Sequence, residues 1–342
     1  MYRLRLTLHF LTLDVITHSE RLYNWIGAHY KSFDQSKRFV DKAQSYTIQI
    51  EDIESPQVLA MGEPGGTRVK FCLLDETCYY KNGVFASSNR GSFIHQCQVD
   101  TVARTAKVNV GGDLLRSEED FIYNVMRDLL KSLVLRVNGL LTLHGAVVTR
   151  GGTSIFLAGE KGMGKSTISL KLMQQGYSMI SDDSPLFTSI DGSTYALSSL
   201  DELSVTENTL RLFPELKPFV TRQREISGKY FISRTLLGEN KLSYGPSAIT
   251  HFIDLKRGHH RQAALIAQSK DVVTAQLFRE DLTLFNLEHP IPDFFSKVNR
   301  FQFDTLGQLI DGAHTYILEY SDEHLDQLPG LIEAVTEEAV CR

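Results

Sequence analysis

The pattern of apolar and polar residues separates a strand-rich first third of the chain from a remainder in which strands and helices alternate. Residues 2–12 alternate apolar and polar side chains, which predicts a β-strand. Residues 20–30 favour a short helix, and residues 45–110 hold strand-like runs separated by Gly, Asp and Asn turns. Asn82-Gly83 lies between two such runs and predicts a hairpin. We therefore expect a β-rich N-terminal domain over residues 1–112.

The remainder begins with a long predicted helix. Ser117 is a good N-cap, and the acidic residues after it favour the positive end of a helix. Its apolar stripe is expected to lie in the core: Ile122, Val125, Met126, Leu129, Leu133 and Val137. Strand-like runs follow at 141–148, 155–158, 177–181, 192–199, 248–255 and 315–320, with helical runs at 205–213, 271–311 and 325–340. This order predicts an α/β domain over residues 113–342, with a central mixed sheet wrapped by helices.

A glycine-rich segment between a strand and a helix carries the clearest chemical motif. Residues 159–166 read Gly-Glu-Lys-Gly-Met-Gly-Lys-Ser and match the phosphate-binding loop pattern G-x-x-x-x-G-K-[ST]. Glycines let the backbone curl, so that several N–H groups and the positive end of the following helix face one phosphate. The motif predicts a nucleotide-binding loop with these contact residues: Gly159, Gly162, Met163, Gly164, Lys165, Ser166 and Thr167.

The side chains at the end of this loop and at the end of the next strand suggest the chemistry. In such loops the lysine reaches the β- and γ-phosphates and the serine ligates Mg²⁺, so ATP and Mg²⁺ are the expected cofactors. No pattern distinguishes ATP from GTP or another phosphate donor. The run 177–181 ends in Asp182-Asp183. If this strand neighbours the loop strand in a parallel sheet, it brings the pair to the edge that carries the loop. One carboxylate can hold Mg²⁺ together with Ser166, and the other can accept a proton from an attacking hydroxyl. Asp254 is a rival carboxylate on a later strand, and we prefer the pair.

The segment around the loop resembles the catalytic domain of the HPr serine kinase/phosphorylase family. Three linked features carry the resemblance: a histidine in Leu143-His144-Gly145-Ala146, the loop, and the strand that ends in Asp-Asp. The resemblance is specific over residues 142–188 and general out to about Tyr320, and it does not cover the first hundred or so residues. It implies an HPr-kinase-like P-loop fold and nucleotide-dependent phosphoryl transfer to a serine hydroxyl of a protein. It also implies a place for His144 near the active site; a core histidine bonded to backbone is the alternative.

The family resemblance also bears on the substrate. Some family members phosphorylate a precursor peptide of a ribosomally made natural product, which makes such a peptide one candidate substrate. The bifunctional HPr enzymes carry a Glu-x-Arg-Gly signature downstream of the Asp pair, and this sequence lacks it; the nearest acidic pair is Asp201-Glu202. We therefore expect kinase activity without phosphorylase activity. The missing signature also argues against the HPr substrate and the hexameric assembly of those enzymes, and whether the protein forms a homo-oligomer stays open.

Composition excludes several other classes of protein. The net charge of −5 argues against a general nucleic-acid binder. No apolar run approaches the roughly 20 residues of a transmembrane helix, and the alternating start is unlike a signal peptide, so a cytoplasmic protein without a membrane partner is expected. The four cysteines (Cys72, Cys78, Cys97 and Cys341) form no Cys-x-x-Cys pair, which argues against structural zinc.

The leading interpretation is an ATP- and Mg²⁺-dependent serine kinase that acts on a peptide or protein, with Asp182, Asp183, His144 and Lys165 as catalytic residues. Two alternatives use the same loop. One is a kinase for a small hydroxylated metabolite, and the other is a nucleotide-dependent switch or ATPase that transfers phosphate to no substrate hydroxyl. The N-terminal domain carries no catalytic motif. It either captures the substrate chain on an exposed strand edge or only buries the apolar stripe of the helix that follows it.

Overall fold

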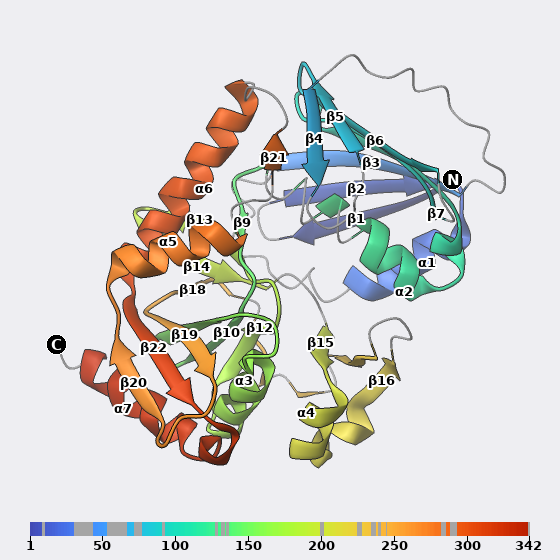
Figure 1. Cartoon of the computed structure of the whole chain (residues 1–342). Coiled ribbons are helices and arrows are strands. Elements are labelled where there is room, and N and C mark those ends of the chain that lie inside the picture. Colours follow the sequence, from blue (N-terminus) through green and yellow to red (C-terminus); the bar gives the residue numbers. More distant parts are fainter. Residues whose placement is uncertain are drawn as a thin grey trace. The chain divides into compact units, whose positions relative to one another are not determined.

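The chain forms two compact units in a computed structural model (Figure 1). The first unit is Met1–Gly139 with Leu282–Phe301, and the second is Leu140–Asp281 with Gln302–Arg342. The structure describes residues 1–8, 11–30, 44–52, 67–71, 77–90, 93–126, 129–130, 134, 137–198, 202–223, 228–233, 237–238, 241–243, 245–281, 285–287 and 293–340.

The first unit is built on a nine-stranded sheet with the strand order β1-β2-β3-β8-β7-β6-β5-β4-β21. The strands are β1 (Tyr2–Leu8), β2 (Leu11–Thr17), β3 (Gln44–Asp52), β4 (Thr67–Phe71), β5 (Thr77–Lys81), β6 (Val84–Arg90), β7 (Phe93–Asp100), β8 (Thr105–Gly112) and β21 (Phe285–Leu287). The stretch that was expected to be one strand at the start is therefore a hairpin of two, β1 and β2, which pair antiparallel. Strands β2, β3 and β8 run parallel to one another.

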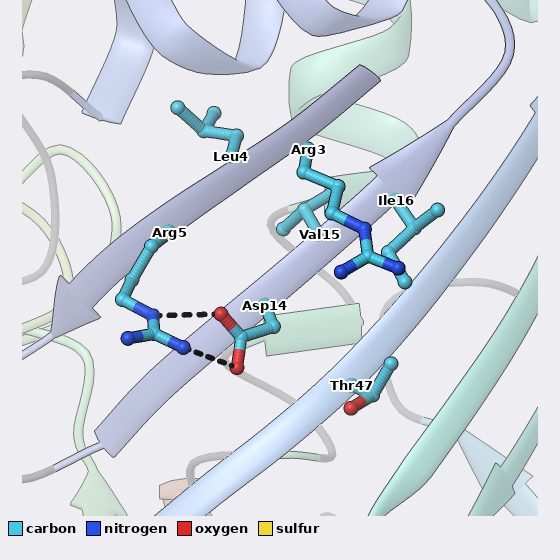
Figure 2. Close-up of a pocket in the computed structure, with 7 residues that line it drawn as sticks. All are labelled: Arg3, Leu4, Arg5, Asp14, Val15, Ile16 and Thr47. Carbon is cyan, nitrogen blue, oxygen red and sulfur yellow. Dashed lines mark hydrogen bonds and ion pairs between the residues drawn. The ribbon is translucent and has the colours of Figure 1, made fainter. Parts of the chain in front are cut away.

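The two faces of this sheet differ in polarity. Along β2 every second residue is buried, as expected for a strand with one face in the core. Helix α1 (Glu20–Tyr30) contacts β1 and β2 and has the bounds that the sequence predicted. The other face carries Arg3, Arg5, Asp14 and Thr47 on three neighbouring strands (Figure 2). This face is therefore polar at the edge of the sheet that β1 forms.

The predicted hairpin at Asn82-Gly83 is confirmed, because these two residues connect the antiparallel strands β5 and β6. Their φ angles are 49° and 87°, which is the left-handed region that a tight two-residue hairpin turn requires. Gly83 O also accepts a hydrogen bond from Thr101 N at 2.9 Å. The turn thereby contacts the next turn of the sheet, between β7 and β8.

The compact units divide the chain after Gly139, whereas the sequence suggested a domain boundary after Gly112. The segment between these two positions packs on the first unit. Its 3₁₀-helix η3 (Asp113–Leu115) contacts β7 and β8, and Leu115 O accepts a hydrogen bond from Arg21 of α1. The rings of Trp25 and Phe121 lie 6.1 Å apart. Of the long predicted helix, α2 (Glu118–Phe121) and the π-helical η4 (Ile122–Met126) are described, while Leu133 lies outside the described residues.

The second unit contains a six-stranded mixed sheet with the order β12-β10-β11-β19-β22-β20. Its strands are β10 (Ala146–Arg150), β11 (Thr153–Ala158), β12 (Ser178–Ser181), β19 (His251–Arg257), β20 (Ala264–Ala267) and β22 (His314–Tyr320). Strands β11, β19 and β22 are parallel, and β10 lies antiparallel between β11 and β12. The carboxyl ends of β11, β12, β19 and β22 and the start of β10 therefore share one edge.

Apolar side chains cover both faces of this sheet. On one face, Ile168 and Leu172 of α3 (Lys165–Gln174) and Leu328 of α7 (Leu328–Val340) share a core with side chains of β11, β19 and β22. On the other face, Phe156 contacts the rings of Phe187 and Phe252, at centroid distances of 5.1 and 5.5 Å. Phe187 belongs to the second, four-stranded sheet of this unit. The central sheet is thus buried on both sides, as the apolar run of β11 indicates.

Smaller elements complete the second unit. The four-stranded sheet has the order β18-β14-β13-β9 and a three-stranded sheet has the order β15-β17-β16. Their strands are β9 (Leu141–Thr142), β13 (Leu186–Ile190), β14 (Ser193–Leu197), β15 (Glu202–Val205), β16 (Val220–Gln223), β17 (Tyr230–Ser233) and β18 (Ser247–Ala248). The remaining helices of this unit are α4 (Glu207–Leu212), η6 (Pro214–Phe219), α5 (Lys270–Asp281) and η9 (Asp322–His324). Helix α6 (Asp293–Gly312) begins in the first unit and belongs to the second from Gln302 onward. The predicted fold class, an α/β domain with a central mixed sheet after a β-rich N-terminal part, is confirmed.

Candidate active site

The glycine-rich segment connects β11 to α3 at the edge where the parallel strands end. Gly159, Gly162 and Gly164 have φ angles of 135°, 91° and 88°, which favour glycine over any other residue. A side chain would also be crowded at two of them. A Cβ on Gly159 would lie 3.0 Å from Leu255 O, and one on Gly164 would lie 2.2 Å from the Tyr320 hydroxyl oxygen. The curl of the loop is thus determined by its glycines and by the strands beside it.

Lys165 lies at the first position of α3 and is buried. Its Nζ donates hydrogen bonds to Gly159 O at 2.6 Å and to Glu160 O at 3.1 Å, so the ammonium group lies over the first turn of the loop. The N-cap of α3 is Gly164, which has no side chain to cap the free N–H groups of the first turn. Ser166 and Thr167 are partly exposed in that turn. The helix end therefore offers backbone donors, a hydroxyl group and one cation to an anion.

His144 and Asp183 lie in contact at the same edge of the sheet. His144 Nδ1 is 3.3 Å from Asp183 Oδ1, and Gly145 N donates a hydrogen bond to Asp183 O at 2.9 Å. The two side chains are partly exposed, at 46% and 37%. His144 was expected on a strand, and this is corrected: it lies in the bend between β9 and β10. The chain leaves the four-stranded sheet there and enters the six-stranded one, because β9 pairs with β13 and β10 with β11.

Asp182 has surroundings unlike those of its neighbour. Its side chain is 7% exposed, and Oδ2 accepts a hydrogen bond of 2.7 Å from Ser204 N of β15. One carboxylate oxygen is therefore engaged by backbone, while Asp183 faces His144 and solvent. The strand that ends in this pair was expected beside the loop strand. Instead β10 lies between β12 and β11, and β12 still ends at the edge of the loop because β10 is antiparallel to both.

Asp254, the rival carboxylate, lies directly beside the start of the loop. In the parallel ladder of β11 and β19 it pairs with Ala158, the last residue before Gly159. Its side chain is fully buried, and Oδ2 lies 2.9 Å from Lys256 Nζ in an ion pair. Apart from this ion pair, neither carboxylate oxygen accepts a hydrogen bond in the part of the chain that the structure describes. Asp254 is therefore a second buried carboxylate at this edge, on the opposite side of the loop strand from β12.

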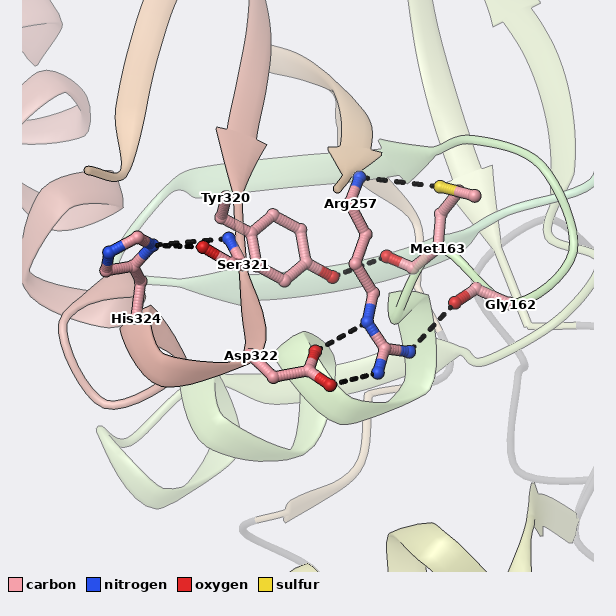
Figure 3. A network of polar contacts seen from close by, with 7 residues as sticks. All are labelled: Gly162, Met163, Arg257, Tyr320, Ser321, Asp322 and His324. Atoms are coloured by element: carbon pink, nitrogen blue, oxygen red, sulfur yellow. Dashed lines mark hydrogen bonds and ion pairs between the residues drawn. The ribbon is translucent and has the colours of Figure 1, made fainter. Parts of the chain in front are cut away.

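Arg257 of β19 and Tyr320 of β22 contact the backbone of the loop, and sequence analysis did not identify either residue (Figure 3). The Tyr320 hydroxyl donates to Met163 O at 2.5 Å, and Arg257 Nη1 donates to Gly162 O at 3.3 Å. Arg257 is itself held by a two-pronged ion pair with Asp322. Burial raises the pKa of Tyr320 to about 12, and the Arg257 guanidinium lowers the pKa of Asp322.

Among the described residues, no group of three or more His, Cys, Asp and Glu side chains is arranged around one metal position. A Mg²⁺ ion bound with a nucleotide needs only one or two protein oxygens, because phosphate oxygens and water supply the rest. Ser166 and the Asp pair offer oxygen ligands of that kind. No helix within the described residues is long and apolar enough to cross a membrane.

Comparisons with known proteins agree with the family resemblance. The chain is 31% identical over 86 residues to the HPr kinase/phosphorylase of Limosilactobacillus reuteri (strain DSM 20016), which is 25% of each chain. It is 37% identical over 62 residues to the HPr kinase/phosphorylase of Xanthomonas campestris pv. campestris (strain B100), which is 18% of each chain. The chain thus spans a quarter or less of the length of these curated relatives. They support an HPr kinase-like family for this protein.

No family model matches the chain. The solved structure of the HPr(Ser) kinase/phosphatase from Coxiella burnetii aligns with a TM-score of 0.32 and 13% sequence identity, over 58% of this chain and 97% of that one.

Proposed function

We propose that this protein is a kinase that transfers the γ-phosphoryl group of ATP to a serine hydroxyl of a peptide or protein. One observation carries the proposal: the glycine loop that ends in Lys165 and the His144–Asp183 pair lie at the same edge of one sheet. A phosphate-binding loop alone would suit any nucleotide-binding protein. A carboxylate in contact with a histidine adds a group that can take a proton from a hydroxyl. The similarity to HPr kinase/phosphorylases supports the same reading.

The loop and the first turn of α3 would bind the phosphate chain. Gly162, Gly164, Ser166 and Thr167 would supply backbone N–H groups, and Gly159 allows the sharp turn that begins the loop. Met163 N–H donates to Glu160 O within the loop. Lys165 would exchange its two carbonyl partners for oxygens of the β- and γ-phosphates. The lysine side chain already extends to the loop, because its ammonium group donates to two loop carbonyls.

The two neighbouring aspartates would divide the remaining tasks. Ser166 and Asp182 would hold a Mg²⁺ ion, whose charge offsets that of the transferring phosphoryl group. Asp183 would accept the proton, because it is partly exposed and reaches His144. In the transfer step, the serine Oγ forms a bond to the γ-phosphorus and the bond from that phosphorus to the β–γ bridging oxygen breaks. The serine proton passes to Asp183, and ADP leaves with the bridging oxygen.

The first unit, which contains the N-terminal strands, would capture the substrate chain. Strand β1 is the edge of its sheet, and among the described strands it pairs only with β2. A pocket of about 600 Å³ lies beside that edge, lined by Arg3, Arg5, Asp14 and Thr47 among others (Figure 2). Arg5 forms a two-pronged ion pair with Asp14, while Arg3 is exposed. An extended peptide could add to β1 as a further strand and place acidic side chains near Arg3.

Incubation with γ-labelled ATP, Mg²⁺ and serine-containing peptides tests the proposal. Label on a peptide serine is the expected result. Release of the label only as inorganic phosphate would favour a nucleotide-dependent switch or ATPase. Label that enters small hydroxylated compounds and no peptide would favour a metabolite kinase.

A further inference from the structure

Two peptide groups of the glycine loop are held from outside by residues far along the chain. The Tyr320 hydroxyl donates to Met163 O, and Arg257 Nη1 donates to Gly162 O (Figure 3). Arg257 is the last residue of β19, which pairs parallel with the loop strand β11. Tyr320 is the last residue of β22, which pairs parallel with β19, and the two residues are partners in that ladder.

Because the peptide group is planar, a contact that fixes its carbonyl oxygen also fixes the direction of its N–H group. In a trans peptide the C=O of one residue and the N–H of the next point in opposite directions. The 162–163 peptide is fixed at both ends, because Met163 N also donates to Glu160 O at 3.2 Å. The 163–164 peptide is fixed only at its carbonyl, by Tyr320. Gly164 N–H therefore points away from Tyr320, and in the described part of the chain it donates no hydrogen bond.

The donors are themselves held in place. Tyr320 is fully buried, its own carbonyl accepts a hydrogen bond from Gly258 N at 2.9 Å, and its raised pKa keeps the hydroxyl protonated at any physiological pH. Arg257 is fixed by Asp322 through Nε and Nη2, which leaves Nη1 for the loop. Gly164 completes the fit, since a Cβ there would collide with the Tyr320 hydroxyl.

We propose that Tyr320 and Arg257 are positioning residues that fix the loop with the Gly164 N–H turned toward a bound phosphate chain. This inference rests on the proposed function. Without the Tyr320 hydroxyl, the 163–164 peptide can rotate and present the Met163 carbonyl where the Gly164 N–H stood. The site then meets an anion with an acceptor instead of a donor, which repels phosphate. Arg257 has the same role for the preceding 162–163 peptide, through its hydrogen bond to Gly162 O.

The test uses the full chain and measures the affinity for Mg²⁺·ADP by calorimetry. Tyr320→Phe keeps the ring and removes the donor, and we expect about tenfold weaker binding, the loss of one well-placed hydrogen bond. Tyr316→Phe is the matched control, because it removes a hydroxyl from the same strand away from the loop. We expect the control to bind as the wild type does. Equal affinity of Tyr320→Phe and the wild type would overturn the proposal.

A second pair of variants covers the case in which Tyr320→Phe fails to fold. Arg257→Gln and its control Arg261→Gln both remove an arginine charge from the surface, and only the first contacts the loop. Weaker binding by Arg257→Gln alone supports the proposal, and equal binding by both contradicts it.

A kinetic readout separates positioning from stability: Tyr320→Phe should raise the KM for ATP and leave the KM for the peptide unchanged. If the wild type itself binds no Mg²⁺·ADP, the proposed function fails and this inference with it.

Discussion

His144 Nδ1 lies 3.3 Å from Asp183 Oδ1, although the two residues lie in separate bends, His144 between β9 and β10 and Asp183 just after β12. The contact depends on the backbone, because Gly145 N donates to Asp183 O and so fixes the bend that carries His144. Gly145 is needed there, since a Cβ would lie 2.1 Å from the Phe156 ring. The contact between His144 and Asp183 therefore forms where the chain passes from the four-stranded sheet to the six-stranded one.

The neighbouring carboxylates should respond differently to removal of their charge. Asp182→Asn and Asp183→Asn should each lower kcat by at least about a hundredfold, the usual contribution of a positioned base or metal ligand. Activity of the variant that lacks the metal ligand, which we expect to be Asp182→Asn, should recover in part at high Mg²⁺. Asp183→Asn should not recover. The measurement is kcat over a Mg²⁺ titration.

Asp254 provides the control for this assignment. It lies beside Ala158 and is buried, so Asp254→Asn should affect stability more than the Mg²⁺ dependence of the rate. If Asp254→Asn abolishes transfer while both neighbouring variants retain it, the metal ligand and base have been assigned to the wrong strand.

The stability of the second unit should fall in weak acid because of His251. Burial, with a smaller effect from His314, lowers the pKa of His251 to about 4, and its Nε2 has no hydrogen-bond partner among the described residues. The folded state therefore holds the ring neutral, while the unfolded state takes up a proton below about pH 6.5. Stability should be highest above that pH and fall by up to about 3 kcal/mol as the pH approaches 4.

Urea denaturation at pH 7.5 and pH 5, followed by circular dichroism, checks the role of His251. The wild type should lose more stability between the two pH values than His251→Gln does, because the variant has no ring to protonate. The same pH response in both proteins would show that other groups cause the acid sensitivity.

We expect this protein to have no phosphorylase activity toward its phosphorylated product. The Glu-x-Arg-Gly signature of the bifunctional enzymes is missing from this sequence. Incubation of the phosphorylated product with inorganic phosphate should therefore yield no pyrophosphate, with release of phosphate by an unrelated phosphatase as the positive control for the substrate. Efficient formation of pyrophosphate would refute this expectation.

Substrate length should matter if the N-terminal unit captures the peptide. Strand β1 carries none of the residues proposed to act on the phosphoryl group, so peptide binding to it should raise kcat/KM for a long substrate more than for a short fragment with the same serine. Arg3→Glu should reduce this difference, while Lys107→Glu, an exposed residue of the inner strand β8, should not. Equal kcat/KM for the long and short peptides would leave the unit with only a structural role.

The sequence revealed those features that local patterns determine. The loop glycines, helix α1 and the Asn82-Gly83 hairpin follow from spacing and turn chemistry over a few residues. The bend at His144 could not be read in the same way, because residues 140–148 are mostly apolar and periodicity does not mark where a strand changes sheets. The antiparallel insertion of β10 was missed for the same reason.

The contacts around the loop show a second limit of sequence reading. Tyr320 and Met163 are 157 positions apart, and no local pattern connects them. The parallel ladder of β11, β19 and β22 brings them together, and that pairing is set by the tertiary fold. The one local trace is Gly164, whose missing side chain leaves room for the tyrosine hydroxyl.

The most direct test of the central claim measures phosphoryl transfer from γ-labelled ATP to a serine peptide by the wild type, Lys165→Ala and Lys161→Ala. Lys165 contacts the loop carbonyls and would span the transferring phosphates, while Lys161 is an exposed lysine of the same loop. The account predicts label on serine with the wild type and with Lys161→Ala, and a rate lower by about a thousandfold or more with folded Lys165→Ala. Near-normal transfer by Lys165→Ala would contradict it.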